Sequence, residues 1–171
     1  MDLKSSIREI PDFPNPGILF RDITTTLKSP AEFCAAVDAM QEKIKDFGDF
    51  DLILGPESRG FIFGTPIAYN LKKAFVPVRK AGKLPCEVYR KSYDLEYGSA
   101  TIEVHKDALQ KGDRVVVVDD LLASGGTSRA IAELVREAGA EVAGMVFFIE
   151  LADLNGREML GECKVESVVV Y

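Results

Sequence analysis

The sequence has few residues of the kinds that hold zinc or form disulfides. It contains three cysteines, Cys34, Cys86 and Cys163, and a single histidine, His105. The cysteines lack C-x-x-C spacing and their number is odd, which argues against a zinc site and against a disulfide framework. We therefore expect free thiols.

Long apolar runs and an excess of basic residues are also missing. No run of roughly 18 or more apolar residues occurs, and the opening stretch MDLKSSIREI lacks the apolar centre of a signal peptide. This predicts a soluble, cytoplasmic protein without a membrane partner. The formal net charge is −6, whereas a nucleic-acid surface needs a basic patch, so we expect no nucleic-acid partner.

The two common nucleotide-binding fingerprints are absent as well. Neither G-x-G-x-x-G nor G-x-x-x-x-G-K-[ST] occurs, which excludes the motifs of dinucleotide-binding and P-loop proteins. With 171 residues, 47% of them hydrophobic, the chain fits one α/β domain with a sizeable core. We expect a single domain over residues 1–171.

The most informative stretch reads RVVVVDDLLASGGTS. Its run Val115–Val118 is apolar on both faces, as a central strand of a parallel sheet requires. Asp119 and Asp120 follow directly, and a glycine turn then leads into an amphipathic helix over residues 128–137. The order is strand, acids, glycine turn and helix.

This order suits a phosphorylated ribose. Glycines in the turn leave backbone N–H groups free to surround a phosphate at a helix N-terminus, and hydroxyls add donors. Asp119 and Asp120 can accept hydrogen bonds from the ribose hydroxyls. The alternative is an ordinary strand–turn–helix with a solvated acidic pair. The predicted ribose-phosphate residues are Asp119, Asp120, Ala123, Ser124, Gly125, Gly126 and Thr127.

The same stretch resembles the phosphoribosyl pyrophosphate (PRPP) motif of the type I phosphoribosyltransferases, in which hydrophobic residues and two acids precede a T/S-G-G-T loop. The resemblance implies that family's fold: an α/β domain with a mainly parallel central sheet flanked by helices, a small hood and a flexible flap. The hood would comprise residues of about 10–24 and 150–160, and the flap residues of about 79–101.

Two further strings resemble the hood of adenine phosphoribosyltransferases, FPNPGILFRDIT and ELxxLxGRE. The resemblance implies that Phe20 stacks on adenine, that backbone at Leu19 reads its edge and that Leu151 packs on the other face. For Phe20, the alternative is a core aromatic.

The string GPESRGF resembles the pyrophosphate loop of the same enzymes. The match implies pyrophosphate binding by Glu57, Ser58 and Arg59, with a cis peptide bond between Glu57 and Ser58. Arg59 would also flank the base and assist catalysis; the alternative is a surface ion pair with Glu57.

Residues 79–101 form a long polar stretch between two apolar strands, as active-site flaps often do. Its strings RKxGKLP and YxLEYG are also found in adenine phosphoribosyltransferases. The match assigns Arg79, Lys80 and Lys83 to the pyrophosphate, although a solvated turn is the alternative. It makes Glu96 the general acid/base candidate. It also implies that Glu96 and Tyr97 move over the base when the flap closes.

The reaction that the resemblance implies converts adenine and PRPP to AMP and pyrophosphate, in purine salvage. Mg²⁺ would be required and held mainly through substrate and water, with no certain protein ligand. The family also implies a homodimer. The alternatives are transfer to another base, such as hypoxanthine, guanine, xanthine or orotate, and a non-enzymatic regulator that senses PRPP.

The remaining elements are expected to be scaffold. We expect a short helix through Glu9, a helix from Pro30 that Gly48 ends, and strands at 51–55 and 75–78. Pro77 suggests either that the last of these strands lies at a sheet edge or that Pro77 begins the turn that leaves it.

Overall fold

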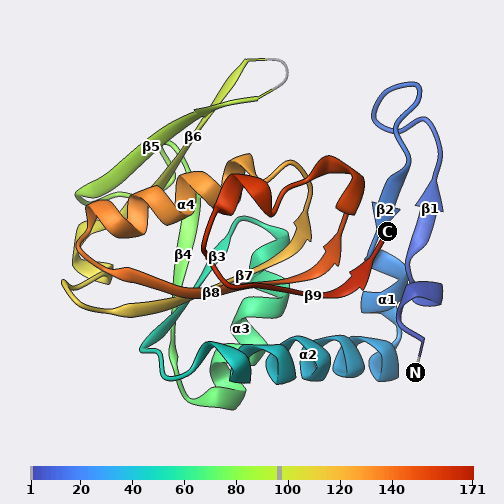
Figure 1. Cartoon of the computed structure of the whole chain (residues 1–171), viewed down its shortest axis with the longest axis horizontal. Helices are drawn as coiled ribbons and strands as arrows, with labels where there is room; N and C mark the ends of the chain where they lie inside the picture. Colours follow the sequence, from blue (N-terminus) through green and yellow to red (C-terminus); the bar gives the residue numbers. More distant parts are fainter. Residues whose placement is uncertain (1, 96–97) are drawn as a thin grey trace. The chain divides into compact units, whose positions relative to one another are not determined.

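The computed structural model describes residues 2–95 and 98–171, and the chain divides into two compact units, Met1–Ala39 and Met40–Tyr171. Figure 1 shows the elements along the chain. No helix in the described ranges is both long and apolar enough to cross a membrane.

A two-stranded sheet organises the first unit. Its elements are η1 (Lys4–Ser6), β1 (Arg8–Ile10), β2 (Phe20–Asp22), α1 (Thr24–Lys28) and the first part of α2 (Pro30–Ile44). β1 and β2 are antiparallel, and ion pairs join Arg8 to Asp22 and Arg21 to Glu9 across them. These opposite charges stand directly across from one another, which stabilises the pairing.

The expected helix through Glu9 is wrong. Only Lys4–Ser6 forms a 3₁₀ turn, and β1 follows it. The hydroxyls of Ser5 and Ser6 each donate to a backbone carbonyl three residues earlier, at 2.8 Å. Such local bonds compete with a longer helix, and the partner strand β2 comes from farther along the chain.

The second unit contains a seven-stranded sheet in the order β5-β6-β4-β3-β7-β8-β9. Strands β4, β3, β7, β8 and β9 run parallel, whereas β5 and β6 form an antiparallel hairpin joined to β4. This confirms the expected α/β fold with a mainly parallel sheet. The strands are β3 (Leu52–Pro56), β4 (Ala74–Lys80), β5 (Val88–Asp94), β6 (Ser99–His105), β7 (Arg114–Leu122), β8 (Glu141–Glu150) and β9 (Val165–Val170).

Helices α3 and α4 cover opposite faces of this sheet (Figure 1). Leu134 of α4 shares a core with Val117 of β7. Phe63 of α3 packs on Phe148 of β8, with ring centroids 5.2 Å apart. β7 is therefore buried on both faces, which explains its uninterrupted run of valines. The helical elements of this unit are α3 (Arg59–Leu71), α4 (Gly126–Glu137), η2 (Lys45–Phe47), η3 (Lys106–Ala108), η4 (Ala152–Leu154) and η5 (Glu158–Leu160).

Two boundaries near the acids differ from the expectation. β7 continues through Asp119 and Asp120 to Leu122, because β8 pairs with it along this whole length, and α4 begins at Gly126 rather than at Ser128. Both acids are thus fixed by strand pairing and do not lie in a loop.

The proline in β4 does not mark a sheet edge, since β4 lies between β6 and β3. β6 pairs with β4 through Arg79 and Lys80, after Pro77 in the chain. The missing N–H of Pro77 therefore removes no bond from that pairing, which is how an inner strand accommodates the residue.

Candidate active site

A cleft of about 380 Å³ lies at the carboxyl ends of β3, β4 and β7. This is where open parallel sheets commonly bind ligands. Its walls are the β3–α3 junction, the end of β4, the β7–α4 loop and part of the β5–β6 hairpin. The predicted site residues that line it are Glu57, Arg59, Arg79, Lys80, Asp119, Asp120, Ala123, Ser124, Gly125, Gly126 and Thr127.

The loop between β7 and α4 is shaped to hold an anion. Gly125 has a φ of +85°, a left-handed conformation that glycine adopts without strain, and it directly precedes Gly126, the first residue of α4. The first N–H groups of a helix lack intrahelical partners, and the helix dipole favours negative charge there. Hydroxyls of Ser124 and Thr127 line the same cleft.

A second segment supports this loop from behind. A Cβ on Gly156 would clash with the carbonyl oxygen of Ala123 and lie 2.9 Å from the side chain of Leu122. A Cβ on Gly125 would lie 2.6 Å from the carbonyl oxygen of Gly156. The N–H of Leu151 donates to the Leu122 carbonyl at 2.9 Å. Direct backbone contact between the two segments therefore fixes the position of the loop.

Arg157 holds the supporting segment in place. Its Nε and Nη2 donate to the two carboxylate oxygens of Glu150 at 2.6 and 2.7 Å, and its Nη1 donates to the carbonyl of Val165 at 2.6 Å. The hydrogen bond from Arg157 lowers the pKa of Glu150. This bidentate pair ties the residue after Gly156 to two strands of the sheet.

Asp119 and Asp120 form an acidic pair on the floor of the cleft. Asp120 is only 3% exposed, its N–H donates to Oδ1 of Asp119 at 2.8 Å, and its Oδ2 lies 3.0 Å from Nε of Arg59. Burial raises the pKa of Asp119, and the neighbouring charge of Asp120 raises it further. Burial also raises the pKa of Asp120, against the opposing charge of Arg59. Two such acceptors suit a ligand that donates from neighbouring hydroxyls.

Arg59 reaches Asp120 because Gly60 lets the two segments approach. A Cβ at Gly60 would lie 3.0 Å from the carbonyl oxygen of Val118 and 3.1 Å from Oδ1 of Asp119. The start of α3 therefore sits directly against the end of β7. Arg59 thus pairs with Asp120, across the cleft floor.

Glu57 has a different partner. Its Oε2 accepts from Nε of Arg79 at 2.6 Å and from the N–H of Lys80 at 3.1 Å, and the Arg79 hydrogen bond lowers the pKa of Glu57. This carboxylate fixes the end of β4 against the β3–α3 junction. The peptide bond between Glu57 and Ser58 is cis, which confirms that expectation.

Not all predicted residues gather in the cleft. Of the described residues, Ser58 and Lys83 are exposed and Leu151 is half-buried, and none of these three lines the cleft. Glu96 and Tyr97 lie outside the described residues.

Leu19 and Phe20 belong to the first unit. Leu19 is 42% exposed, and the ring of Phe20 meets that of Phe13 edge-on with centroids 5.2 Å apart. Their assignment to the base stays a prediction.

Comparison with known proteins decides the family. The model of the phosphoribosyl transferase domain matches residues 23–167. An adenine phosphoribosyltransferase of Acetivibrio thermocellus is 54% identical over 171 residues, covering 100% of both chains. The chain belongs to the adenine phosphoribosyltransferases. It is thus a pentosyltransferase of purine salvage, as the motifs predict.

Solved adenine phosphoribosyltransferases share the fold throughout. That of Thermoanaerobacter pseudethanolicus has a TM-score of 0.95 and 48% identity, covering 99% of this chain and 98% of that one. The enzyme of Saccharomyces cerevisiae, in complex with adenine and D-2,5-dideoxy-2,5-imino-altritol 1,6-bisphosphate, has a TM-score of 0.93 and 39% identity. It covers 98% of this chain and 96% of that one.

The sequence motifs assign no role to two residues, Gly156 and Tyr93, that contact the β7–α4 loop. Gly156 lies in the string GRE, but local sequence does not reveal which backbone it contacts. Tyr93 lines the cleft from β5, and its hydroxyl lies 3.0 Å from Oγ1 of Thr127. Its place in the alternating burial pattern of β5 is the sequence signal that predicts an inward-facing side chain.

The acidic pair bears on magnesium. Within the described ranges, no group of three or more His, Cys, Asp or Glu side chains is arranged to hold a metal ion. Asp119 and Asp120 nevertheless provide carboxylate oxygens, the ligand type that Mg²⁺ prefers, and the ion commonly keeps water and substrate oxygens as its other ligands. The residues therefore fit an ion that is held largely by substrate.

Proposed function

We propose that this cleft binds PRPP and that the chain transfers its phosphoribosyl group to N9 of adenine, giving AMP and pyrophosphate. The observation that carries the proposal is the acidic pair at the end of β7, directly followed by the glycine loop that begins α4. In order and chemistry, this arrangement matches a sugar and its phosphate.

The 5′-phosphate is assigned to the β7–α4 loop. Backbone N–H groups around Gly125 and Gly126 would donate to it, with the hydroxyls of Ser124 and Thr127. Asp119 and Asp120 would accept hydrogen bonds from the ribose hydroxyls, which lie on the same sugar but away from its 5′-phosphate. Carboxylates repel phosphate. The order of acidic pair and glycine loop along the chain therefore determines the orientation of PRPP in the cleft.

The pyrophosphate is assigned to the opposite wall. Arg79 and Lys80 at the end of β4 line the cleft there, while Arg59 lies between this wall and the acidic pair. Positive groups aimed at a leaving polyanion stabilise the transition state, in which negative charge builds on the pyrophosphate. Ser58 and Lys83 stay part of this assignment as predictions.

Magnesium belongs to the same proposal. Asp119 and Asp120 would hold the ion indirectly, through ribose hydroxyls and water. When bound, it neutralises negative charge on the leaving pyrophosphate.

Base recognition is assigned to Leu19, Phe20 and Leu151, with Arg59 at the edge of the base. The adenine in the yeast relative supports adenine as the base, because that chain matches this one along nearly its whole length. A homodimer and a cytoplasmic location complete the proposal; light scattering of the purified protein checks the first.

The function is tested by incubating the protein with PRPP, Mg²⁺ and one base at a time, and by measuring pyrophosphate release. Adenine should be turned over, with hypoxanthine, guanine, xanthine and orotate far slower, and chelation of Mg²⁺ should stop the reaction. Turnover restricted to another base would contradict the assignment of adenine. Absence of turnover with every base would contradict enzyme function.

Asp119→Asn should weaken PRPP binding and raise the free energy of unfolding. Loss of a charged acceptor is expected to raise the KM for PRPP about tenfold or more. Asp120→Asn should raise this KM in the same way. The pKa of Asp119 is raised by burial, so its charged form costs stability above the unfolded pKa of Asp. The free energy of unfolding of Asp119→Asn should therefore exceed that of the wild type at pH 7, and the gain should vanish near pH 4.

Steady-state kinetics and denaturant unfolding at the two pH values measure these effects. Asp107→Asn serves as the control, because Asp107 is exposed in η3. It should change neither quantity. An unchanged KM for PRPP in both cleft variants would refute the ribose assignment.

A further inference from the structure

Tyr93 connects the hairpin to the first turn of α4. Its hydroxyl lies 3.0 Å from Oγ1 of Thr127, and either oxygen can donate. Its ring lies over Gly126, since a Cβ there would be 3.7 Å from Cδ2 of Tyr93. β5 runs alongside α4 (Figure 1). A hairpin side chain thus touches the loop assigned to the 5′-phosphate.

Tyr93 also borders two spaces. Tyr93, Asp94 and Gly126 line both the main cleft and a second cavity of about 300 Å³ between β5 and α4. The side chain therefore borders both spaces, while its hydroxyl makes a polar contact with Thr127. Tyr93→Phe removes the hydroxyl and keeps the ring, so it tests the polar contact alone.

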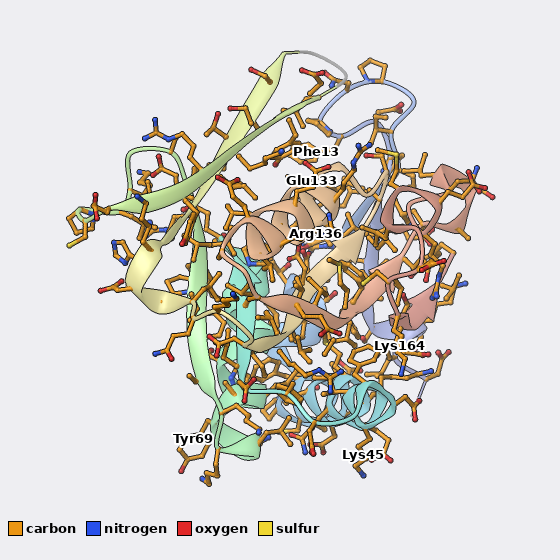
Figure 2. The ribbon with its side chains drawn as sticks, turned by 60° about the vertical axis from the view of Figure 1, so that its left-hand side comes forward. Phe13, Lys45, Tyr69, Glu133, Arg136 and Lys164 are labelled. Carbon is orange, nitrogen blue, oxygen red and sulfur yellow. The ribbon has the colours of Figure 1, made fainter. Side chains whose placement is uncertain are left out.

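A contact independent of this hydroxyl holds the hairpin on α4. Nζ of Lys91 lies 2.8 Å from Oε2 of Glu133, and the hydrogen bond from Lys91 lowers the pKa of Glu133. Glu133 also pairs with Arg129, one turn earlier in α4. Figure 2 labels Glu133 among the side chains of α4, below the hairpin. Loss of the Tyr93 hydroxyl therefore leaves the hairpin attached.

We propose that Tyr93 is a positioning residue, which orients the hydroxyl of Thr127 toward the 5′-phosphate of the substrate. A threonine hydroxyl has one proton to donate, and a phosphate dianion only accepts. When Thr127 donates to phosphate, its oxygen is left to accept, so Tyr93 must donate to it. Phosphate binding thus selects one of the two possible directions of this hydrogen bond and couples the hairpin to the phosphate.

The inference rests on the proposed function of the cleft, but its test needs no turnover. Binding of ribose 5-phosphate is measured by isothermal titration calorimetry for the wild type, Tyr93→Phe, Thr127→Val and the double variant. Tyr93→Phe should weaken binding about fivefold to tenfold, because a hydrogen bond to a charged network is lost. The same substitution should have no further effect when residue 127 is valine.

Kinetics add a second readout. Tyr93→Phe should raise the KM for PRPP and leave the KM for adenine unchanged. The matched control is Tyr89→Phe, which removes a hydroxyl from the same strand at a residue that lines neither space. It should bind ribose 5-phosphate like the wild type.

Three results would overturn the inference: wild-type affinity in Tyr93→Phe, additive losses in the double variant, or no binding of ribose 5-phosphate by the wild type. If ribose 5-phosphate binds with the expected coupling but no base is turned over, the proposed reaction fails and the role of Tyr93 stands.

Discussion

Glu96→Gln is expected to lower turnover about 10²- to 10⁴-fold while the KM for PRPP stays nearly unchanged. Adenine must lose the proton on N9 as the new bond forms, and a carboxylate can accept it whereas an amide cannot. Glu96 lies outside the described residues, but Leu95 before it and Ala100 and Thr101 after it line the cleft. The assignment of Glu96 to the reacting base stays a prediction.

Steady-state kinetics with PRPP and adenine varied separately measure this effect. Glu87→Gln is the matched control, because its side chain is 85% exposed at the other end of the hairpin, and it should be as active as the wild type. The acid limb of the pH profile of turnover should disappear in Glu96→Gln alone. Wild-type turnover in this variant would remove Glu96 from the mechanism.

Gly156→Ala is expected to lower kcat/KM for PRPP about 10²-fold, although this residue does not line the cleft. The added methyl group would overlap the carbonyl oxygen of Ala123 and crowd Leu122. Backbone atoms cannot move aside like the end of a side chain, so the phosphate loop itself must shift. A displacement of about 1 Å in a positioning element is enough for such a loss. Overpacking should also lower stability by about 1–3 kcal/mol.

Gly161→Ala provides the comparison within the same segment. Among the described residues, no atom lies within 4 Å of a Cβ at Gly161, although its φ of +59° favours glycine. This variant should lose about 1 kcal/mol of stability and keep the PRPP kinetics of the wild type. Equal kinetics in the two variants, measured where both are folded, would show that contact with Ala123 does not position the loop.

The string RVVVVDDLLASGGTS shows how far local sequence reaches. A strand buried on both faces, a turn that needs left-handed backbone and a helix start each have their own residue requirements, so all three are readable without a fold. The end of the strand was not readable. Asp119 and Asp120 belong to β7 because β8 pairs alongside them, and charged residues give no local sign of that pairing.

The N-terminal segment shows the opposite case. Residues up to Glu9 have no strong periodicity, and the choice between helix and strand depended on pairing with β2. The same limit applies to ion pairs. Glu57 and Arg59 are two residues apart and opposite in charge, yet Glu57 binds Arg79 and Arg59 binds Asp120, because the cleft brings distant strand ends together.

By itself, the sequence determined the family, the mainly parallel sheet and the segments that form the cleft, because each of these depends on residue types at short spacing. Only the tertiary structure decided which side chains meet within it. Gly156 supports the phosphate loop at Ala123, and Tyr93 contacts Thr127. Both contacts join residues more than thirty positions apart. Contacts of this kind depend on how strands and helices pack, and no local pattern records them.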